Sequence, residues 1–223
     1  MKFLYNKDAG LEYLNIESEA YKYLFRVRRF KQGDIIELRN LQDDILYSYK
    51  IDNVSKKSAT LRLLHSEKII VLPKRTLIIG WCIIDPKVVE KTIPMLNEIG
   101  VTKIVFIKCA YSQANFKINI DRVKKIAINS SQQCGRNSLI EFEFSNSLSN
   151  FLEKYPQSYM LNFSKQTLES VKEDINSIVI GCEGGFSNEE IKLIKEDKIV
   201  GLDTPLILRS ETAVVTISSK ILI

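Results

Sequence analysis

A chain of 223 residues with 45% apolar residues, 26% charged residues and a net charge of +5 has the composition of an ordinary globular protein. No apolar run approaches the ~20 residues of a membrane-spanning helix, and the first residues meet a charge and a glycine too early for a signal peptide. We therefore expect a cytosolic protein with room for one large domain or two small ones.

The cysteines and the histidine argue against two classes of site. Cys82, Cys109, Cys134 and Cys182 form no C-x-x-C pair, and the chain is too long to depend on disulfide bonds. His65 stands in a polar, strand-like stretch and is expected at the surface. Because zinc needs about four clustered nitrogen or sulfur ligands, we expect no metal site and no histidine-activated nucleophile.

The first third of the chain reads as short strands between polar turns. Strands are expected over residues 35–38, 45–54 and 59–64, and a helix over about 17–29. Strands at ~10-residue spacing are typical of a small barrel.

The end of that helix carries a run of positive charge. Arg26, Arg28, Arg29 and Lys31 place four cations within six residues. Such a run is often only a solvated charged face. The alternative is a patch that contacts RNA phosphates.

From about residue 68 onward, apolar runs alternate with amphipathic helices, which indicates an α/β domain. The run over 76–84 is continuous, as in a parallel strand buried on both faces. Asp85 and Pro86 suit the start of a helix that ends at Gly100. Further strands are expected over 104–109, 159–163, 177–181 and 198–202, and further helices over 121–133 and 211–222. We predict domains over residues 1–68 and 72–223.

A glycine-rich segment follows the predicted strand at 177–181. Gly181, Gly184 and Gly185 allow either a tight turn or the close approach of a ligand to the backbone. Ser187 and Glu190 have the spacing of a capping box, which predicts a helix start. The segment is neither G-x-G-x-x-G nor a P-loop, so a dinucleotide or nucleoside triphosphate site is disfavoured.

Two further segments lie at helix ends. Before the last helix, Ser210 suits the N-cap and Glu211 suits the helix dipole, whereas Arg209 is a cation where the dipole disfavours one. A carboxylate partner or an anionic ligand would resolve that conflict. At the end of the helix over 121–133, Gly135 and Arg136 are explained by a helix C-terminus alone.

Together these segments resemble the 16S rRNA uridine-N3 methyltransferase family of the SPOUT superfamily. The resemblance covers nearly the whole chain, in the same order and spacing. The matching segments are Gln133 to Arg136, Gly181 to Gly185, Ile207 to Ala213, Glu98 to Val101, and, in the first domain, Leu24, Val27, Arg29, Gly33 and Asp34. Three positions depart from the family pattern: Cys182 replaces a proline, Leu206 replaces an arginine, and Met95 stands where a lysine is common.

The resemblance implies a PUA-like N-terminal β-barrel that binds RNA and a C-terminal SPOUT α/β domain with a deep trefoil knot. It also implies a homodimer and S-adenosylmethionine as the cofactor. The residues expected to bind the cofactor are Leu161, Gly181, Cys182, Glu183, Gly184, Gly185, Leu202, Ile207, Leu208, Thr212 and Ala213.

The implied reaction is methylation of N3 of a uridine in 16S rRNA of the small ribosomal subunit. N3 carries a proton, so the site needs a proton acceptor or cations that stabilise the developing anion. Arg136 and Arg209 suit the second role. Glu183 or Glu211 would act as the base or hold an arginine in place, and we favour the holding role for at least one of them. Expected RNA contacts are Arg26, Arg28, Arg29, Lys31 and Arg136.

Three alternatives stay open at this point. The first is a SPOUT methyltransferase that acts on another RNA uridine. The second is a non-catalytic RNA-binding module, which leaves the glycine-rich segment unexplained. The third is a nucleotide-binding α/β enzyme, which would lack a phosphate-binding lysine motif.

Overall fold

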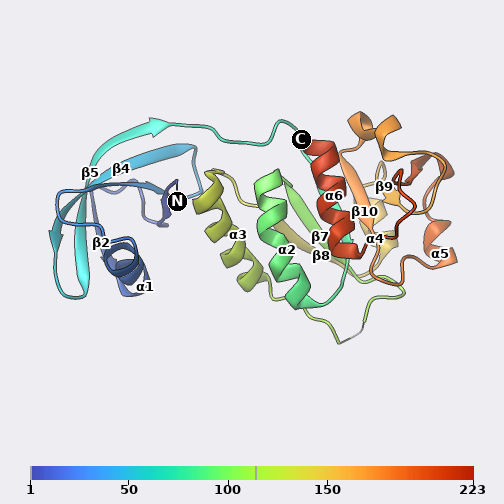
Figure 1. Cartoon of the computed structure of the whole chain (residues 1–223), viewed down its shortest axis with the longest axis horizontal. Helices are drawn as coiled ribbons and strands as arrows, with labels where there is room; N and C mark the ends of the chain where they lie inside the picture. Colours follow the sequence, from blue (N-terminus) through green and yellow to red (C-terminus); the bar gives the residue numbers. More distant parts are fainter. Residues whose placement is uncertain (1, 114) are drawn as a thin grey trace. The chain divides into compact units, whose positions relative to one another are not determined.

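The computed structural model describes residues 2–113 and 115–223, and the chain divides into two compact units (Figure 1). The first unit runs to Leu72 and also includes Ser131–Ser138; the second comprises Pro73–Ser130 and Leu139–Ile223. Among the described residues, no helix is long and apolar enough to cross a membrane.

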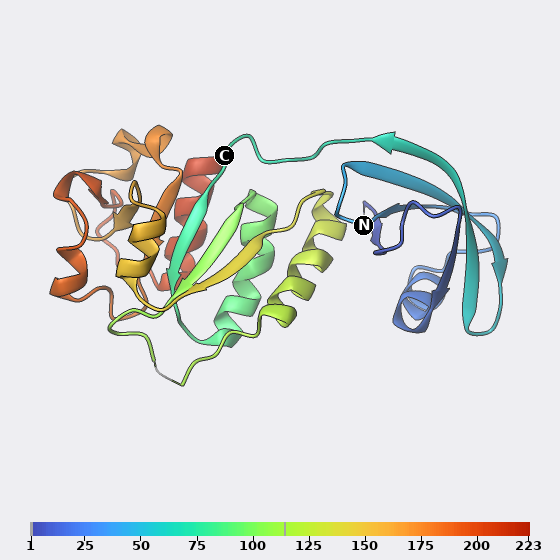
Figure 2. The same ribbon diagram turned by 180° about the vertical axis from the view of Figure 1, so that it is seen from behind.

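The first unit is built on a curled five-stranded sheet (Figure 2). Its strands, in spatial order, are β1 (Leu4–Tyr5), β3 (Ile35–Arg39), β4 (Ile45–Val54), β5 (Ser58–Lys68) and β2 (Tyr13–Glu17). All neighbours are antiparallel except β1 and β3. The three strands expected from sequence are confirmed. The sheet is an open half-barrel, with β1 and β2 at its two ends.

The helix expected over 17–29 is confirmed, but it changes type along its length. It begins as α1 (Ser18–Tyr21) and continues as the π-helix η1 (Lys22–Val27). Leu24 is fully buried in the core of the first unit. The chain then turns at Arg29, whose φ of 62° lies in the left-handed region.

The return of residues 131–138 to the first unit is fixed by hydrogen bonds. Gln132 accepts a hydrogen bond from the backbone N–H of Tyr5 at 2.8 Å. The Asn137 side chain donates to Asp44 and accepts from the backbone N–H of Val71, each at 2.7 Å. No sequence pattern marked this return.

The second unit contains a six-stranded sheet in which all neighbouring strands pair in parallel. This confirms the expected α/β architecture. In spatial order the strands are β11 (Ile199–Val200), β9 (Tyr159–Leu161), β10 (Ser177–Ile180), β6 (Ile78–Cys82), β7 (Lys103–Ile107) and β8 (Glu141–Ser145). All four residues of β10 are buried, as expected of a central strand covered on both faces.

Helices cover both faces of this sheet (Figures 1 and 2). The helix α2 (Pro86–Ile99) packs against α6 (Ser210–Leu222) on one face, and α4 (Leu148–Lys154) lies on the other. Gly80 faces α4 so closely that an added Cβ would lie 2.8 Å from the Phe151 ring. The remaining helices are α3 (Ile120–Cys134), α5 (Asn188–Ile191) and the 3-10 turns η2 (Leu168–Ser170), η3 (Lys172–Asp174) and η4 (Glu196–Lys198).

The predicted limits of α2 are confirmed in detail. The Asp85 carboxylate accepts a hydrogen bond from the backbone N–H of Lys87, which caps the helix start. Gly100 ends the helix with a φ of 108°, a conformation that favours glycine.

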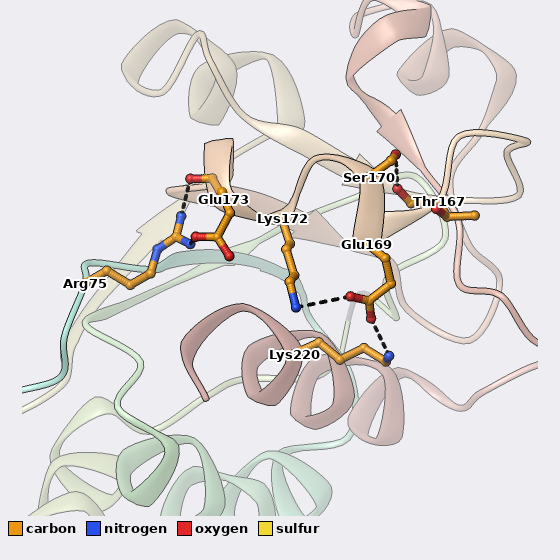
Figure 3. Close-up of polar contacts among 7 residues, drawn as sticks. All are labelled: Arg75, Thr167, Glu169, Ser170, Lys172, Glu173 and Lys220. Atoms are coloured by element: carbon orange, nitrogen blue, oxygen red, sulfur yellow. Dashed lines mark hydrogen bonds and ion pairs between the residues drawn. The ribbon is translucent and has the colours of Figure 1, made fainter.

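Ion pairs attach the segment before β10 to its surroundings (Figure 3). Glu169 accepts from Lys172 and from Lys220 of α6. Arg75 pairs with Glu173 at 3.0 Å and also donates to the backbone carbonyls of Glu173 and Ile175. Exposed pairs of this kind each contribute about 0–1 kcal/mol, so they orient the segment more than they stabilise the fold.

Two of the cysteines are bonded to each other. Cys82 ends β6 and Cys109 follows β7, and their sulfurs form a disulfide with the Cα atoms 5.7 Å apart. Because β6 and β7 already pair in the sheet, the bond joins segments that backbone hydrogen bonds hold together. His65 is exposed, and within residues 2–113 and 115–223 no group of His, Cys, Asp or Glu could hold a metal ion.

Candidate functional site

A cavity of about 640 Å³ opens at the carboxyl ends of β9, β10 and β11. Its volume lies within the range of small-molecule sites, and its place is where open α/β sheets bind ligands. Three segments from distant parts of the sequence form its wall. They contribute Leu161, Asn162, Phe163 and Ser164; Ile180, Gly181, Cys182, Glu183, Gly184, Gly185 and Phe186; and Gly201, Leu202, Thr204, Leu206, Ile207, Leu208, Arg209, Ser210 and Ala213.

The glycine-rich segment after β10 forms a tight turn. The backbone N–H of Gly185 donates to the carbonyl of Cys182 at 2.9 Å, and Gly185 has a φ of 70°. The predicted capping box is confirmed: Ser187 and Glu190 each accept a backbone N–H from the other. The turn is thereby held at the start of α5.

A neighbouring residue leaves no room for a side chain at Gly184. A Cβ there would lie 2.9 Å from the Cβ of Tyr111, so a larger residue would displace that tyrosine. Replacing Gly184 would therefore disturb packing as well as any ligand. It is a poor position at which to test cofactor binding.

Cys182 contributes a neutral thiol to the cavity wall. The residue is buried, and its thiol lies 3.8 Å from the carbonyl oxygen of Gly185. Burial raises the pKa of the Cys182 thiol, which keeps the thiolate, the nucleophilic form, scarce near neutral pH. The side chain can line an apolar ligand but is poorly suited to attack one.

The segments after β9 and β11 approach each other through their backbones. The backbone N–H of Asn162 donates to the carbonyl of Val200 at 3.0 Å. A Cβ on Gly201 would lie 2.7 Å from the carbonyl oxygen of Ser164, a distance that no real side chain tolerates. Gly201 is therefore required for this part of the wall to close.

The start of α6 differs from the prediction. We expected Ser210 as the N-cap, but Arg209 occupies that position, without a side-chain cap, and Ser210 is the first helical residue. The Ser210 hydroxyl instead donates to the carbonyl of Gly181 at 2.6 Å. The prediction was wrong because partners distant in sequence engage this hydroxyl: the indole N–H of Trp81 donates to it and the Gly181 carbonyl accepts from it, in place of the helix's own N–H groups.

Arg209 is exposed at the rim of the cavity. Within the described part of the chain, no ion pair joins it to Glu183 or Glu211, so the carboxylate partner favoured from the sequence is not present. Its guanidinium group keeps its donors available to a bound molecule. Three large apolar side chains share this rim and are strongly exposed: Phe163 at 83%, Leu206 at 72% and Ile207 at 82%.

The structure brings most of the predicted site residues together. All the residues expected to bind the cofactor line the cavity except Thr212, which is exposed on α6. Among the expected catalytic residues, Glu183 and Arg209 line it. Glu211 lies on α6 and is not part of the wall.

Nine of the lining residues were named neither as cofactor-binding nor as catalytic residues. They are Asn162, Phe163, Ser164, Ile180, Phe186, Gly201, Thr204, Leu206 and Ser210. Most directly follow or precede a predicted strand end. The family resemblance implies three loops around the cofactor, after the strand over 159–162, over 181–185 and over 202–213. These loops contain five of the nine residues: Phe163, Ser164, Thr204, Leu206 and Ser210.

Arg136 belongs to the first unit and is not among the residues that line the cavity. It is 5% exposed, and its Nε donates to the Ser138 hydroxyl at 2.9 Å. Burial lowers the pKa of Arg136 to about 10. The charge is kept at neutral pH, and a catalytic or RNA-binding role for this residue stays a prediction.

The cationic cluster, defined as Arg26, Arg28, Arg29 and Lys31, lies where η1 ends. All four side chains are exposed. In the residues that the structure describes, none of the four takes part in a salt bridge. Four uncompensated cations on one turn form a suitable surface for a polyanion.

Comparison with known proteins gives one consistent picture. Residues 72–222 match the family described as an RNA methyltransferase domain, and residues 16–64 match an RNA methyltransferase PUA domain. Ribosomal RNA small subunit methyltransferase E of Helicobacter pylori (strain ATCC 700392 / 26695) is 36% identical over 98% of both chains. The protein of that name from Rickettsia conorii is 28% identical over 89% of this chain and 84% of its own.

Solved structures share the fold. A putative methyltransferase from Legionella pneumophila, in complex with the cofactor SAM, aligns with a TM-score of 0.84 and 24% identity over 99% of this chain and 96% of its own. A ribosomal RNA small subunit methyltransferase E from Neisseria gonorrhoeae, bound to S-adenosyl methionine, aligns with a TM-score of 0.79 and 18% identity over 98% and 95%. With one relative more than 30% identical along almost its entire length and a family match over two thirds of its residues, this chain belongs to the ribosomal RNA small subunit methyltransferase E family.

Proposed function

We propose that this protein transfers a methyl group from S-adenosylmethionine to N3 of a specific uridine in the 16S rRNA of the small ribosomal subunit. The observation that carries the proposal is the cavity at the ends of β9, β10 and β11, because it combines a glycine-rich turn with an exposed arginine at its rim. The family relatives are named as methyltransferases of small-subunit ribosomal RNA, which supports the proposal.

The cavity suits the cofactor in size and chemistry. Its volume of about 640 Å³ holds a molecule of that class, and Leu161, Leu202, Leu208 and Ala213 offer apolar surface to a flat base. The turn from Gly181 to Gly185 presents backbone groups without intervening side chains. When bound, S-adenosylmethionine supplies a methyl group on a positively charged sulfonium.

Two residues at the rim would have separate roles in the reaction at the target base. N3 of uracil must lose its proton as it is methylated, and negative charge develops on the neighbouring carbonyl oxygens. Arg209 would stabilise that charge with its fixed donors. Glu183, a carboxylate at the same rim, is the better placed of the two candidate proton acceptors, since Glu211 lies outside the wall.

The cationic cluster would hold the RNA by its backbone while the base enters the site. Phosphate contacts position a nucleic acid but do not read its sequence. Because N3 is used in base pairing, the target uridine must be unpaired or turned out of a helix. Binding and chemistry would then be assigned to different units of the chain.

We further infer that the protein acts as a homodimer in the cytoplasm and that its second domain contains the trefoil knot of the SPOUT superfamily. Family resemblance supports these inferences. The strong exposure of Phe163, Leu206 and Ile207, which all line the same cavity, also supports a partner, since large exposed apolar side chains that gather at one site are typical of an interface or a ligand site. Light scattering on the purified protein measures the dimer directly.

The experiment for the proposed function uses small subunits from a strain that lacks this protein. Incubation with the protein and labelled S-adenosylmethionine should label 16S rRNA, and mass spectrometry should find the mass of one methyl group on a uridine. Digestion to nucleosides should yield 3-methyluridine. A methyl group at another position of uracil or on another RNA would refute the stated reaction, and absence of labelling on every RNA would favour a non-catalytic binding module.

A further inference from the structure

A hydrogen-bonded relay lies directly behind the cavity. The indole Nε1–H of Trp81 donates to the Ser210 hydroxyl at 2.9 Å, and that hydroxyl donates to the Gly181 carbonyl at 2.6 Å. Trp81 is fully buried and Ser210 is 5% exposed. A serine hydroxyl has only one hydrogen to donate, so the Ser210 hydroxyl cannot donate to another acceptor while it is bonded to the Gly181 carbonyl.

The relay connects three elements that sequence distance separates. Trp81 lies in β6, Gly181 is the first residue after β10, and Ser210 is the first residue of α6. Two of its members, Gly181 and Ser210, line the cavity, whereas Trp81 stands behind them. The relay therefore sets the distance between two of the three segments that form the wall.

Its position also bears on Arg209, the residue that immediately precedes Ser210. Arg209 makes no side-chain cap to α6, so the adjoining serine is the anchored point at this end of the helix. If the Ser210 hydroxyl lost its acceptor, the start of α6 and the Gly181 turn would be free to separate. Buried hydrogen bonds of this kind fix one arrangement where several would pack equally well.

We propose that Trp81 and Ser210 are positioning residues for the cofactor site: Trp81 orients the Ser210 hydroxyl, and that hydroxyl holds the Gly181 turn against the start of α6. Neither needs to touch the reacting atoms. The inference rests on the proposed function, since it takes the cavity to be the S-adenosylmethionine site.

The test measures binding of S-adenosylhomocysteine, the demethylated product, by calorimetry. Ser210→Ala and Trp81→Phe should each weaken binding about 3- to 10-fold, the range expected for one hydrogen bond. Because Trp81 acts through Ser210, Trp81→Phe should add little in a Ser210→Ala background. In steady-state assays, KM for S-adenosylmethionine should rise, and kcat should fall much less than in Arg209→Ala.

A matched control lies at the opposite end of β10. The hydroxyls of Ser177 and Ser158 form a buried hydrogen bond of 2.8 Å there, and neither residue lines the cavity. Ser177→Ala should lower the melting temperature as Ser210→Ala does but leave affinity for S-adenosylhomocysteine unchanged. Trp81 is the single tryptophan of the chain, so its fluorescence should respond to the ligand in the unmodified protein and less in Ser210→Ala.

The outcomes separate the two proposals. If the unmodified protein binds and the two variants bind equally well, with only a lowered melting temperature, the relay is structural and the inference is wrong. Additive effects of Trp81→Phe and Ser210→Ala would also overturn the relay. If the unmodified protein does not bind S-adenosylhomocysteine at all, the cofactor assignment itself fails. Should Ser210→Ala not fold, Trp81→Phe alone still separates a structural role from a positioning role, because it replaces the indole by a smaller aromatic ring without the N–H donor and leaves the Ser210 hydroxyl in place.

Discussion

The cavity and the cationic cluster are built in contrasting ways. The cavity is formed by backbone turns, small residues and a buried relay, all positioned by the carboxyl ends of parallel strands. The cationic cluster consists of exposed side chains on a single turn, without salt bridges in the described part of the chain. The first arrangement fixes a small molecule and its reacting atoms, whereas the second attracts an extended anion with little demand on geometry. Variants of each should therefore affect different measured quantities.

The largest effect is expected for Arg209→Ala. Loss of one preorganised donor to a developing anion typically costs about 10²–10³ in rate, so single-turnover methyl transfer should fall by that factor while RNA affinity changes much less. Arg209→Lys should recover only part of the rate, because an ammonium lacks the planar fork of donors. An unchanged single-turnover rate would remove Arg209 from the catalytic residues.

The next effect concerns RNA binding by the cationic cluster. In the double variant Arg28→Ala and Arg29→Ala, the salt dependence of RNA binding should fall by roughly one unit per lost phosphate contact. The matched control is Lys56→Ala with Lys57→Ala, which removes the same charge from two exposed positions between β4 and β5. If both double variants shift the salt dependence equally, only net charge matters and the cationic cluster is no special surface.

A smaller effect is expected at the apolar rim. Ile207→Ala should weaken S-adenosylmethionine binding several-fold, since covering an aliphatic side chain contributes up to about 1.5–3 kcal/mol and Ile207 can be covered only in part. Its exposed fraction of 82% predicts an unchanged melting temperature. Ile35→Ala, at an exposed position of the first unit, is the control and should leave cofactor affinity unaltered. If the Ile207→Ala protein binds S-adenosylmethionine as tightly as the unmodified protein, the ligand does not contact this rim.

The smallest effect is a gain in stability. Arg29 has a φ of 62°, which favours glycine, so Arg29→Gly should raise the free energy of unfolding by up to about 1 kcal/mol. The same change removes a predicted phosphate contact and should weaken RNA binding. Arg28→Gly, at a φ of −84°, should destabilise instead. Denaturant unfolding compares the two variants. A loss of stability in Arg29→Gly would show that the Arg29 side chain makes contacts that stabilise the fold.

The sequence predicted those elements whose limits depend only on residues close together in the chain. The capping residues of α2, the capping box of α5 and the apolar runs of the central strands were all confirmed, because each depends on neighbours within a few residues. The strands β1, β2 and β8 carried no comparable signal, being short or half exposed. The π-helical turns of η1 could not be separated from an α-helix, since the two share the same buried face at Tyr21 and Leu24.

The site was predictable to the extent that its motifs sit at strand ends. The glycine-rich turn and the segment before α6 could be expected to meet, because parallel strands place their carboxyl ends together. The role of Ser210 could not be predicted: its acceptor is Gly181, and its donor is Trp81, both far away in sequence. The burial of Arg136, which belongs to the segment 131–138 that returns to the first unit, was not predicted either.

The assignment of chemistry to the cavity and of RNA affinity to the cationic cluster is tested most directly by one titration. Single-turnover methyl transfer at saturating S-adenosylmethionine is measured against RNA concentration for the Arg28→Ala and Arg29→Ala double variant. We predict that the midpoint moves to higher RNA concentration while the rate at saturation equals that of the unmodified protein. A lowered rate at saturation with an unchanged midpoint would contradict the division, because it would place the cationic cluster in the chemical step.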